Sequence, residues 1–199
     1  MQNTGTLVIL SAFSGLLGAL LTQLMTGLFS YVNDRRKQQF ELQKQYRGKR
    51  AEIGESFYFM HGELMSMIKK NIAYWKNRQD YRSEVTLQFL KLEIDRLDGY
   101  QSRLQTENWK YNLVGIYYHI PYDFADMLDD NKTSHELYLK VLDLSEVIRR
   151  TLPQEREDIY GNYLVVLNEL IQHYEKVYLR MTENMEAVKT QLLQDFKSN

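Results

Sequence analysis

The sequence predicts an all-α protein, in which a single N-terminal transmembrane helix precedes a cytosolic bundle of four or five helices. The first observation is that residues 1–33 contain none of the chain's 25 Lys and Arg and none of its 26 Asp and Glu residues. Beyond this segment, apolar residues recur every three or four positions, which is the period of an amphipathic helix. Strand-like alternation never lasts for more than a few residues, and only two prolines and ten glycines interrupt the 199 residues.

The uncharged N-terminal segment predicts a membrane anchor over residues 1–33. Its apolar run, from Leu7 to Val32, spans about 39 Å as a helix with a rise of 1.5 Å per residue. The hydrocarbon core of a bilayer needs only about 20 residues. A cleaved signal peptide would begin with a basic region and would carry an apolar stretch of about 7–15 residues. Because Met1–Thr6 has no basic residue, we favour the anchor.

The basic residues after this segment predict its orientation. Arg35, Arg36 and Lys37 follow the apolar run directly, and cytoplasmic flanks carry the excess of Lys and Arg. We therefore expect a short N-terminus outside the membrane, a basic juxtamembrane helix over residues 34–52 and a cytosolic bundle over residues 53–199. The three cations would also lie near anionic lipid headgroups, although a topology signal is sufficient to explain them.

Small and polar residues within the predicted span indicate self-association. Small side chains let helix backbones approach closely in lipid, and the amide of Gln23 needs a hydrogen-bond partner at membrane depth. The partner would come from another copy, another protein or a water-filled lumen, unless a tilted helix brings Gln23 to the interface. The residues predicted to line the contact or lumen are Ser11, Gly15, Gly18, Thr22, Gln23 and Thr26.

The predicted bundle begins with an apolar stripe from Ile53 to Trp75, joined to the span through Gly48 and Gly54, which leave the form of that junction open. Ser83 is placed to cap the next helix. A turn at residues 129–131 is expected to end a short helix, and Thr133–Glu136 forms a capping box that would open another. Pro153 suits the first turn of a final helix of about 40 residues, long enough for its end to contact another copy.

Catalytic motifs are missing from the sequence. The chain has no cysteine, which excludes disulfides, thiolate metal sites and cysteine nucleophiles. It has no paired-histidine metal motif, phosphate-binding loop or nucleophile elbow. We therefore predict no metal, no cofactor and no enzymatic activity.

Asn112 and His119 are the remaining candidates for chemistry. They lie seven residues apart among aromatic residues, a spacing that one continuous helix would place on a single face. Such a cluster could stack a nucleic-acid base. The alternative is that these aromatic residues belong to an ordinary bundle core with their polar tips hydrogen-bonded.

The layout resembles the small membrane accessory proteins of type VI-B CRISPR systems, which are viewed as carrying a divergent helical domain of the HEPN class. HEPN ribonucleases use an Arg that precedes a His by four to six intervening residues. No histidine here has such an Arg, and Asn112 stands in its place before His119. An Asn cannot supply the fixed positive charge that an Arg places on phosphate. The resemblance implies a role in bacterial antiviral defence beside an RNA-guided nuclease, with a protein or RNA partner.

These observations predict a membrane-anchored, self-associating and non-enzymatic effector or accessory protein, whose partners are the lipid bilayer and other copies of the chain and which could enclose a pore. Two alternatives belong to other functional classes. One is a membrane-tethered, divergent HEPN-like ribonuclease that uses His119. The other is a passive scaffold that recruits a cytosolic partner to the membrane.

Overall fold

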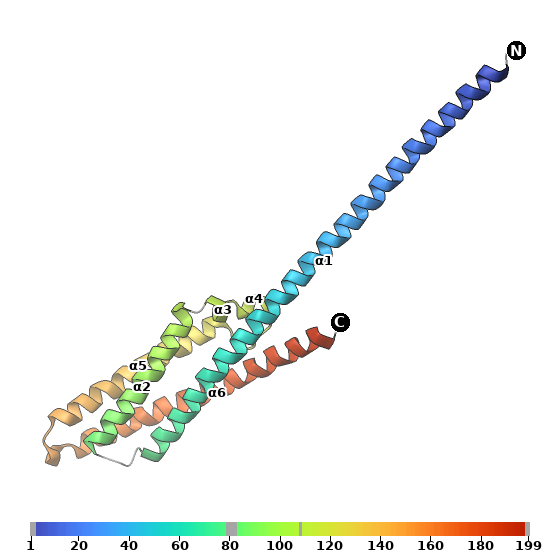
Figure 1. Ribbon diagram of the computed structural model, residues 1–199. Coiled ribbons are helices and arrows are strands. Elements are labelled where there is room, and N and C mark those ends of the chain that lie inside the picture. Colours follow the sequence, from blue (N-terminus) through green and yellow to red (C-terminus); the bar gives the residue numbers. More distant parts are fainter. Residues whose placement is uncertain (1–2, 79–82, 108, 198–199) are drawn as a thin grey trace. The chain divides into compact units, whose positions relative to one another are not determined.

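The computed structural model describes residues 3–78, 83–107 and 109–197, with side chains from Ser14 onward except those of residues 105, 107, 109 and 197. Within these residues the structure contains helices and no strand, so the prediction of an all-α fold is confirmed (Figure 1). The elements are α1 (Asn3–Arg78), α2 (Glu84–Glu107), α3 (Trp109–Asn112), α4 (Val114–Tyr117), α5 (Phe124–Arg150), η1 (Pro153–Glu155) and α6 (Glu157–Lys197).

The chain divides into two compact units, Met1–Lys49 and Arg50–Asn199. Helix α1 supplies the first unit and continues into the second, and it passes through Gly48 and Gly54 without a break. In the first unit, every described side chain from Ser14 to Gly48 is exposed. By length and composition, α1 is the one helix among the described residues that could cross a membrane.

The second unit is built from four long antiparallel helices. The later part of α1 and helices α2, α5 and α6 follow one another with alternating direction, which is the up-and-down topology of a four-helix bundle. One ion pair marks each of the four interfaces: Lys70–Glu93 for α1 with α2, Lys91–Glu146 for α2 with α5, Asp130–Arg180 for α5 with α6, and Lys76–Glu175 for α6 with α1.

The apolar stripes of the sequence form the core of this bundle. Their side chains recur every three or four residues, so each helix presents one continuous apolar face to its neighbours. The largest fully buried side chains come from all four long helices and are Ile53, Phe57, Ile68, Trp75, Leu90, Ile94, Leu97, Ile148, Leu167, Leu170, Tyr174 and Met181.

The predicted start of the third long helix is wrong. Helix α5 runs unbroken through residues 129–131, and its N-cap is Asp123, whose side chain accepts a hydrogen bond from the backbone N–H of Asp126 at 2.9 Å. Thr133 is not a cap, because its hydroxyl donates to the carbonyl of Asp129 within the same helix. Tertiary contacts override the local turn preference here, since Asp130 and Ser134 are buried against α6.

The other predicted helix boundaries agree more closely with the structure. Ser83 caps α2, accepting a hydrogen bond at 3.2 Å from the backbone N–H of Thr86. Helix α6 has 41 residues, which confirms the predicted length of the final helix. Contrary to the prediction, Pro153 does not lie in the first turn of the final helix. It begins the short 3-10 helix η1 instead, and α6 starts at Glu157.

Candidate functional site

The predicted contact residues of the first unit face open space. A Cβ atom added at Gly15 or Gly18 would meet nothing within 4 Å. The hydroxyls of Thr22 and Thr26 donate to the carbonyls of Gly18 and Thr22, at 2.8 and 2.7 Å, so the helix itself satisfies them. The side chain of Gln23 makes no hydrogen bond to any other described residue. Ser11 belongs to α1, but its side chain lies outside the described ones.

Most of these residues share one face of α1. With 3.6 residues per turn, Ser11, Gly15, Gly18, Thr22 and Thr26 fall within about 80° of arc, and Gln23 lies about 60° beyond the edge of that sector. We call these five residues the small-residue face. The opposite side carries large apolar side chains, which include those of Leu16, Leu20 and Leu24, and all three are exposed.

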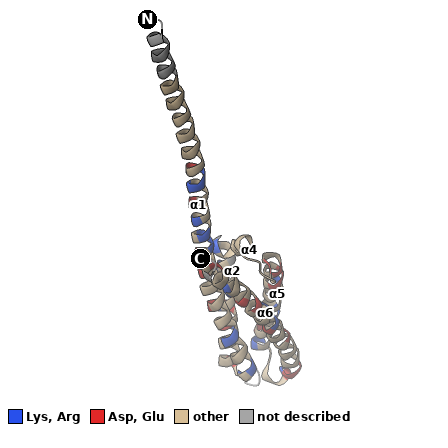
Figure 2. Ribbon diagram, turned by 90° about the vertical axis from the view of Figure 1, so that its right-hand side faces the viewer, with Lys and Arg blue, Asp and Glu red and all other residues tan. Residues whose placement is uncertain are grey.

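The predicted basic flank follows this apolar segment on α1 (Figure 2). Arg35, Arg36 and Lys37 are all exposed. The guanidinium of Arg35 lies 6.0 Å from the ring centroid of Tyr31, within the range of a cation–π contact. The first charged residue, Asp34, accepts a hydrogen bond from the Ser30 hydroxyl at 3.4 Å. Within the first unit, therefore, the change from apolar to charged surface takes about one helical turn.

The expected pairing of Asn112 and His119 on one helical face is wrong. Helix α3 ends at Asn112, α4 covers only Val114–Tyr117, and Tyr118 has an extended backbone. The backbone of His119 is held by Gln191 of α6, whose amide accepts from the His119 N–H at 3.0 Å and donates to its carbonyl at 2.7 Å. No continuous helix therefore joins the two residues.

Two of the aromatic residues around Asn112, Tyr111 and Tyr118, belong to the core of the bundle, whereas the side chain of Trp109 lies outside the described ones. Tyr111 is buried, and its ring stacks on Phe57 with 5.1 Å between ring centroids. Tyr118 is also buried and donates its hydroxyl hydrogen to the carbonyl of Arg50 at 2.7 Å. Rings that are covered by protein on this scale present no face on which a nucleic-acid base could stack.

A histidine that the sequence analysis did not select lies beside Tyr111. His61 is fully buried, with its Nδ1 atom 2.9 Å from the Tyr111 hydroxyl and its Nε2 atom 3.2 Å from the carbonyl of Met181. Because a carbonyl only accepts hydrogen bonds, Nε2 carries the proton and Nδ1 accepts from Tyr111. Burial lowers the pKa of His61 to about 3, so this imidazole is neutral at pH 7.

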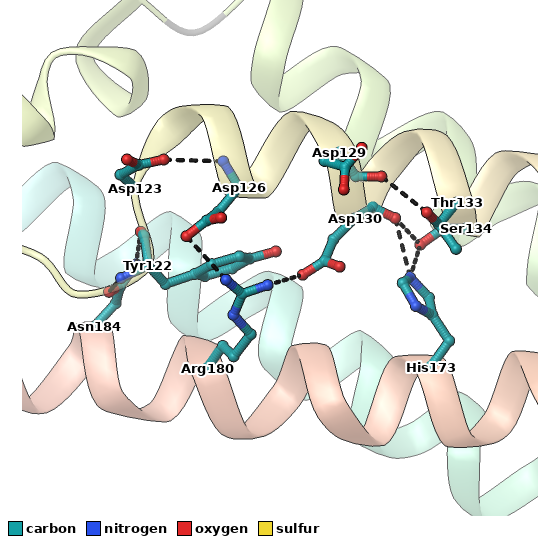
Figure 3. Close-up of polar contacts among 10 residues, drawn as sticks. All are labelled: Tyr122, Asp123, Asp126, Asp129, Asp130, Thr133, Ser134, His173, Arg180 and Asn184. Carbon is teal, nitrogen blue, oxygen red and sulfur yellow. Dashed lines mark hydrogen bonds and ion pairs between the residues drawn. The ribbon is translucent and has the colours of Figure 1, made fainter.

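A polar network joins α5 to α6 (Figure 3). The guanidinium of Arg180 donates to the carboxylates of Asp130 at 2.8 Å and Asp126 at 2.9 Å, and it covers the ring of Tyr122 at 4.3 Å. Burial, together with the negative charge of Asp130, raises the pKa of the Tyr122 phenol. The side chain of Asn184 fixes the Tyr122 backbone through bonds of 3.0 and 2.7 Å.

The same network contains a serine and a histidine that do not form a nucleophilic pair. The Ser134 hydroxyl lies 2.9 Å from Nε2 of His173, but both groups also lie within 3.0 Å of the carbonyl of Asp130. That carbonyl can only accept, so Nε2 carries a proton and cannot remove one from the serine. Ser134 is moreover fully buried. The arrangement is suited to joining two helices and not to acyl transfer.

Comparison of the chain with protein-family models, with curated proteins and with solved structures found no match. Among the described residues, no group of three His, Cys, Asp or Glu side chains could hold a metal ion.

Proposed function

We propose that this chain is a membrane-anchored, self-associating protein without enzymatic activity, which acts as an effector or accessory protein at the bacterial inner membrane. The observation that carries the proposal is the exposed apolar segment of α1. Its large side chains are between 49% and 69% exposed and are those of Leu16, Leu17, Leu20, Leu21, Leu24, Met25, Leu28 and Phe29.

The energetic argument for lipid follows from this exposure. Complete burial of one Leu, Phe or Met side chain is worth about 1.5–3 kcal/mol. The free-energy cost of leaving eight such side chains in water is as large as the whole stability of a typical domain, which is about 5–15 kcal/mol. A bilayer removes this cost, and the segment is long enough to cross its hydrocarbon core. The cations at Arg35, Arg36 and Lys37 support a cytosolic position for the following residues.

Self-association is supported by the small-residue face. The surroundings of Gly15 and Gly18 are open, and small residues in such positions let a second helix approach closely in lipid. The hydroxyls of Thr22 and Thr26 already have partners, which leaves the amide of Gln23 as the polar group that gains most from a neighbouring helix. We infer that the neighbour is a second copy of α1, because Gln23 of each copy can then bond to the other.

The absence of enzymatic activity is proposed from the chemistry of the bundle. His61 is neutral and covered, and Ser134 and His173 are bonded in a way that prevents proton transfer between them. His119 is exposed, yet nothing in the geometry of the described residues places an arginine beside it. No observation favours the ribonuclease, and the role in CRISPR-linked defence stays a prediction of the resemblance.

The proposal is tested by the mass of the full-length protein in an uncharged detergent, measured by light scattering. We expect a discrete oligomer, whose mass falls in the Gly18→Leu and Gln23→Leu variants. The control is Leu20→Ile on the opposite side of the helix, which should leave the mass unchanged. A monomer in all four samples would contradict self-association and would favour the passive scaffold.

Two further assays separate the remaining alternatives. A pore should carry current across a planar bilayer when the purified oligomer is added, and an oligomer that carries none would exclude the pore. The protein should leave RNA intact on incubation. Cleavage that the His119→Ala substitution abolishes would instead favour the ribonuclease.

A further inference from the structure

A cavity of about 200 Å³ lies in the bundle between the first half of α2, the end of α5 and the start of α6. Neither the membrane proposal nor the network around Arg180 uses this cavity. Its floor is apolar, because Leu87, Ile148 and Tyr160 line it and all three are buried. The nearby Ser145 hydroxyl already has a hydrogen-bond acceptor, since it donates to the carbonyl of Leu142 at 2.7 Å.

The rim of the cavity is charged. Lys91, Arg149 and Arg156 stand against the two carboxylates of Glu84 and Glu146, an excess of one positive charge. Here the cations are in excess, so an anion that enters the cavity meets a favourable local charge.

The carboxylate of Glu146 is paired with cations other than Arg156. It already contacts Arg149 at 2.8 Å, Lys91 at 3.6 Å and Arg150 at 3.9 Å. Hydrogen bonds from Arg149 are the main cause that lowers the pKa of Glu146, so this carboxylate is ionised and its charge is shared among three cations.

Arg156 differs from the other cations of the rim. No carboxylate of the described residues lies within 4.0 Å of its guanidinium, and its Nε donates to the carbonyl of Thr151 at 2.8 Å. This bond orients the guanidinium plane and leaves the two terminal nitrogens for another acceptor. Two parallel N–H donors at fixed spacing match the oxygens of a carboxylate or a phosphate group.

We propose that this cavity binds a small organic anion, whose apolar body contacts Leu87, Ile148 and Tyr160 and whose carboxylate or phosphate group is held by Arg156. The ligand is small because drug-sized ligands occupy pockets of about 300–1,000 Å³, which exceeds this cavity. A lone inorganic ion would leave the apolar floor uncovered. The anion thus needs both a charged head and a ring or short chain.

Titration calorimetry of the full-length protein in an uncharged detergent tests this inference. The probes are phenyl phosphate, benzoate, inorganic phosphate and benzyl alcohol. We expect at least one of the two aromatic anions to bind at least about tenfold more tightly than inorganic phosphate and benzyl alcohol, a difference that requires both parts of the site. Whichever anion binds more tightly identifies the head group.

Matched variants locate the site. Arg156→Gln should weaken binding by about tenfold or more, the size expected for loss of a charge-assisted pair. Arg103→Gln makes the same change of charge at an exposed position of α2 outside the cavity and should leave binding unchanged. Gln88→Trp keeps Arg156 and fills the cavity from its rim, so it should also abolish binding and covers the case in which Arg156→Gln unfolds the bundle.

The inference is overturned if neither aromatic anion gives saturable binding, if inorganic phosphate binds equally well, or if the Arg103 and Arg156 variants bind alike. Every residue that lines the cavity lies in the second unit. These outcomes therefore do not depend on whether copies of the chain associate in the membrane.

Discussion

The two units of the chain place the same types of residue in opposite surroundings. Leu24 in the first unit is 63% exposed, whereas Leu167 in the bundle is fully buried. The hydroxyl of Thr22 bonds back to its own helix, whereas the buried Ser134 also contacts His173 of another helix. The bundle thus buries its apolar stripes within one chain. The first unit, in contrast, has an apolar surface and an amide that only surroundings outside the chain can satisfy.

The largest expected effect comes from making one substitution in both units. Leu167→Ala should lower the free energy of unfolding of the bundle by about 2–5 kcal/mol, because it leaves a cavity in a packed core. Leu24→Ala removes the same atoms from an exposed position and should change that free energy by less than about 0.5 kcal/mol. Urea unfolding followed by circular dichroism measures both, and equal losses would contradict the division into two units.

The next effect concerns the buried carboxylate of the bundle. Arg180→Ala removes the cation that pairs with Asp130 and should cost about 2–3 kcal/mol of unfolding free energy, because a buried charge is left without its partner. Lys189→Ala breaks an exposed pair with Glu186 on the same helix and should cause no measurable change in the same urea assay. If the two variants unfold at the same urea concentration, the network around Arg180 does not stabilise the bundle.

A pH titration separates the bundle from the first unit, because the four histidines all lie in the bundle. Burial lowers the pKa of His61 from its ordinary value of 6.5 to about 3 in the folded protein, so the unfolded chain binds more protons between these values. Above about pH 6.5, His61 therefore does not lower the free energy of unfolding. Below this pH, His61 lowers the free energy of unfolding by up to about 1.4 kcal/mol per pH unit.

The His61→Gln variant isolates that contribution. Between pH 7.5 and pH 4.5 the original protein should lose about 3 kcal/mol more unfolding free energy than the variant, since the carboxylates are common to both. Urea unfolding at the two pH values gives the comparison. A variant that shows the same pH dependence as the original would mean that His61 is not held neutral by burial.

The smallest effects come from glycines of the bundle. A Cβ at Gly54 would lie 2.7 Å from Cζ of the buried Tyr118, so Gly54→Ala should destabilise the bundle by about 1–2 kcal/mol. Gly99 has open space around it, so Gly99→Ala within α2 should stabilise the bundle by about 0.5–1 kcal/mol. Thermal unfolding distinguishes them, and changes of the same sign would contradict the packing of Tyr118 on α1.

Features that depend on neighbours in the sequence were predictable. The apolar stripes, the Ser83 cap and the length of α6 follow from side-chain spacing and from capping chemistry, which act within a few residues. His61 could also have been assigned to the core, because it lies four residues after Phe57 on the same stripe. The hydrogen bonds of His61 to Tyr111 and Met181 could not have been predicted, because these partners lie 50 and 120 residues away in the sequence.

The errors arise where tertiary contacts outweigh local preference. Residues 129–131 have the composition of a turn, yet Asp130 is bonded to Arg180 and the helix continues through them. The segment from Asn112 to His119 has helical spacing, yet Gln191 fixes the His119 backbone in an extended stretch. In both places the deciding partner lies on α6, at least 50 residues further along the chain.

The central claim, association through the small-residue face, is tested most directly by cross-linking single cysteines in isolated membranes, because the chain has no native cysteine. Single substitutions to Cys at Gly15, Gly18 and Thr22 should give oxidised dimers, whereas those at Leu16, Leu20 and Leu24 should remain monomeric. Efficient cross-linking on the leucine side, or equal cross-linking all around the helix, would contradict the account.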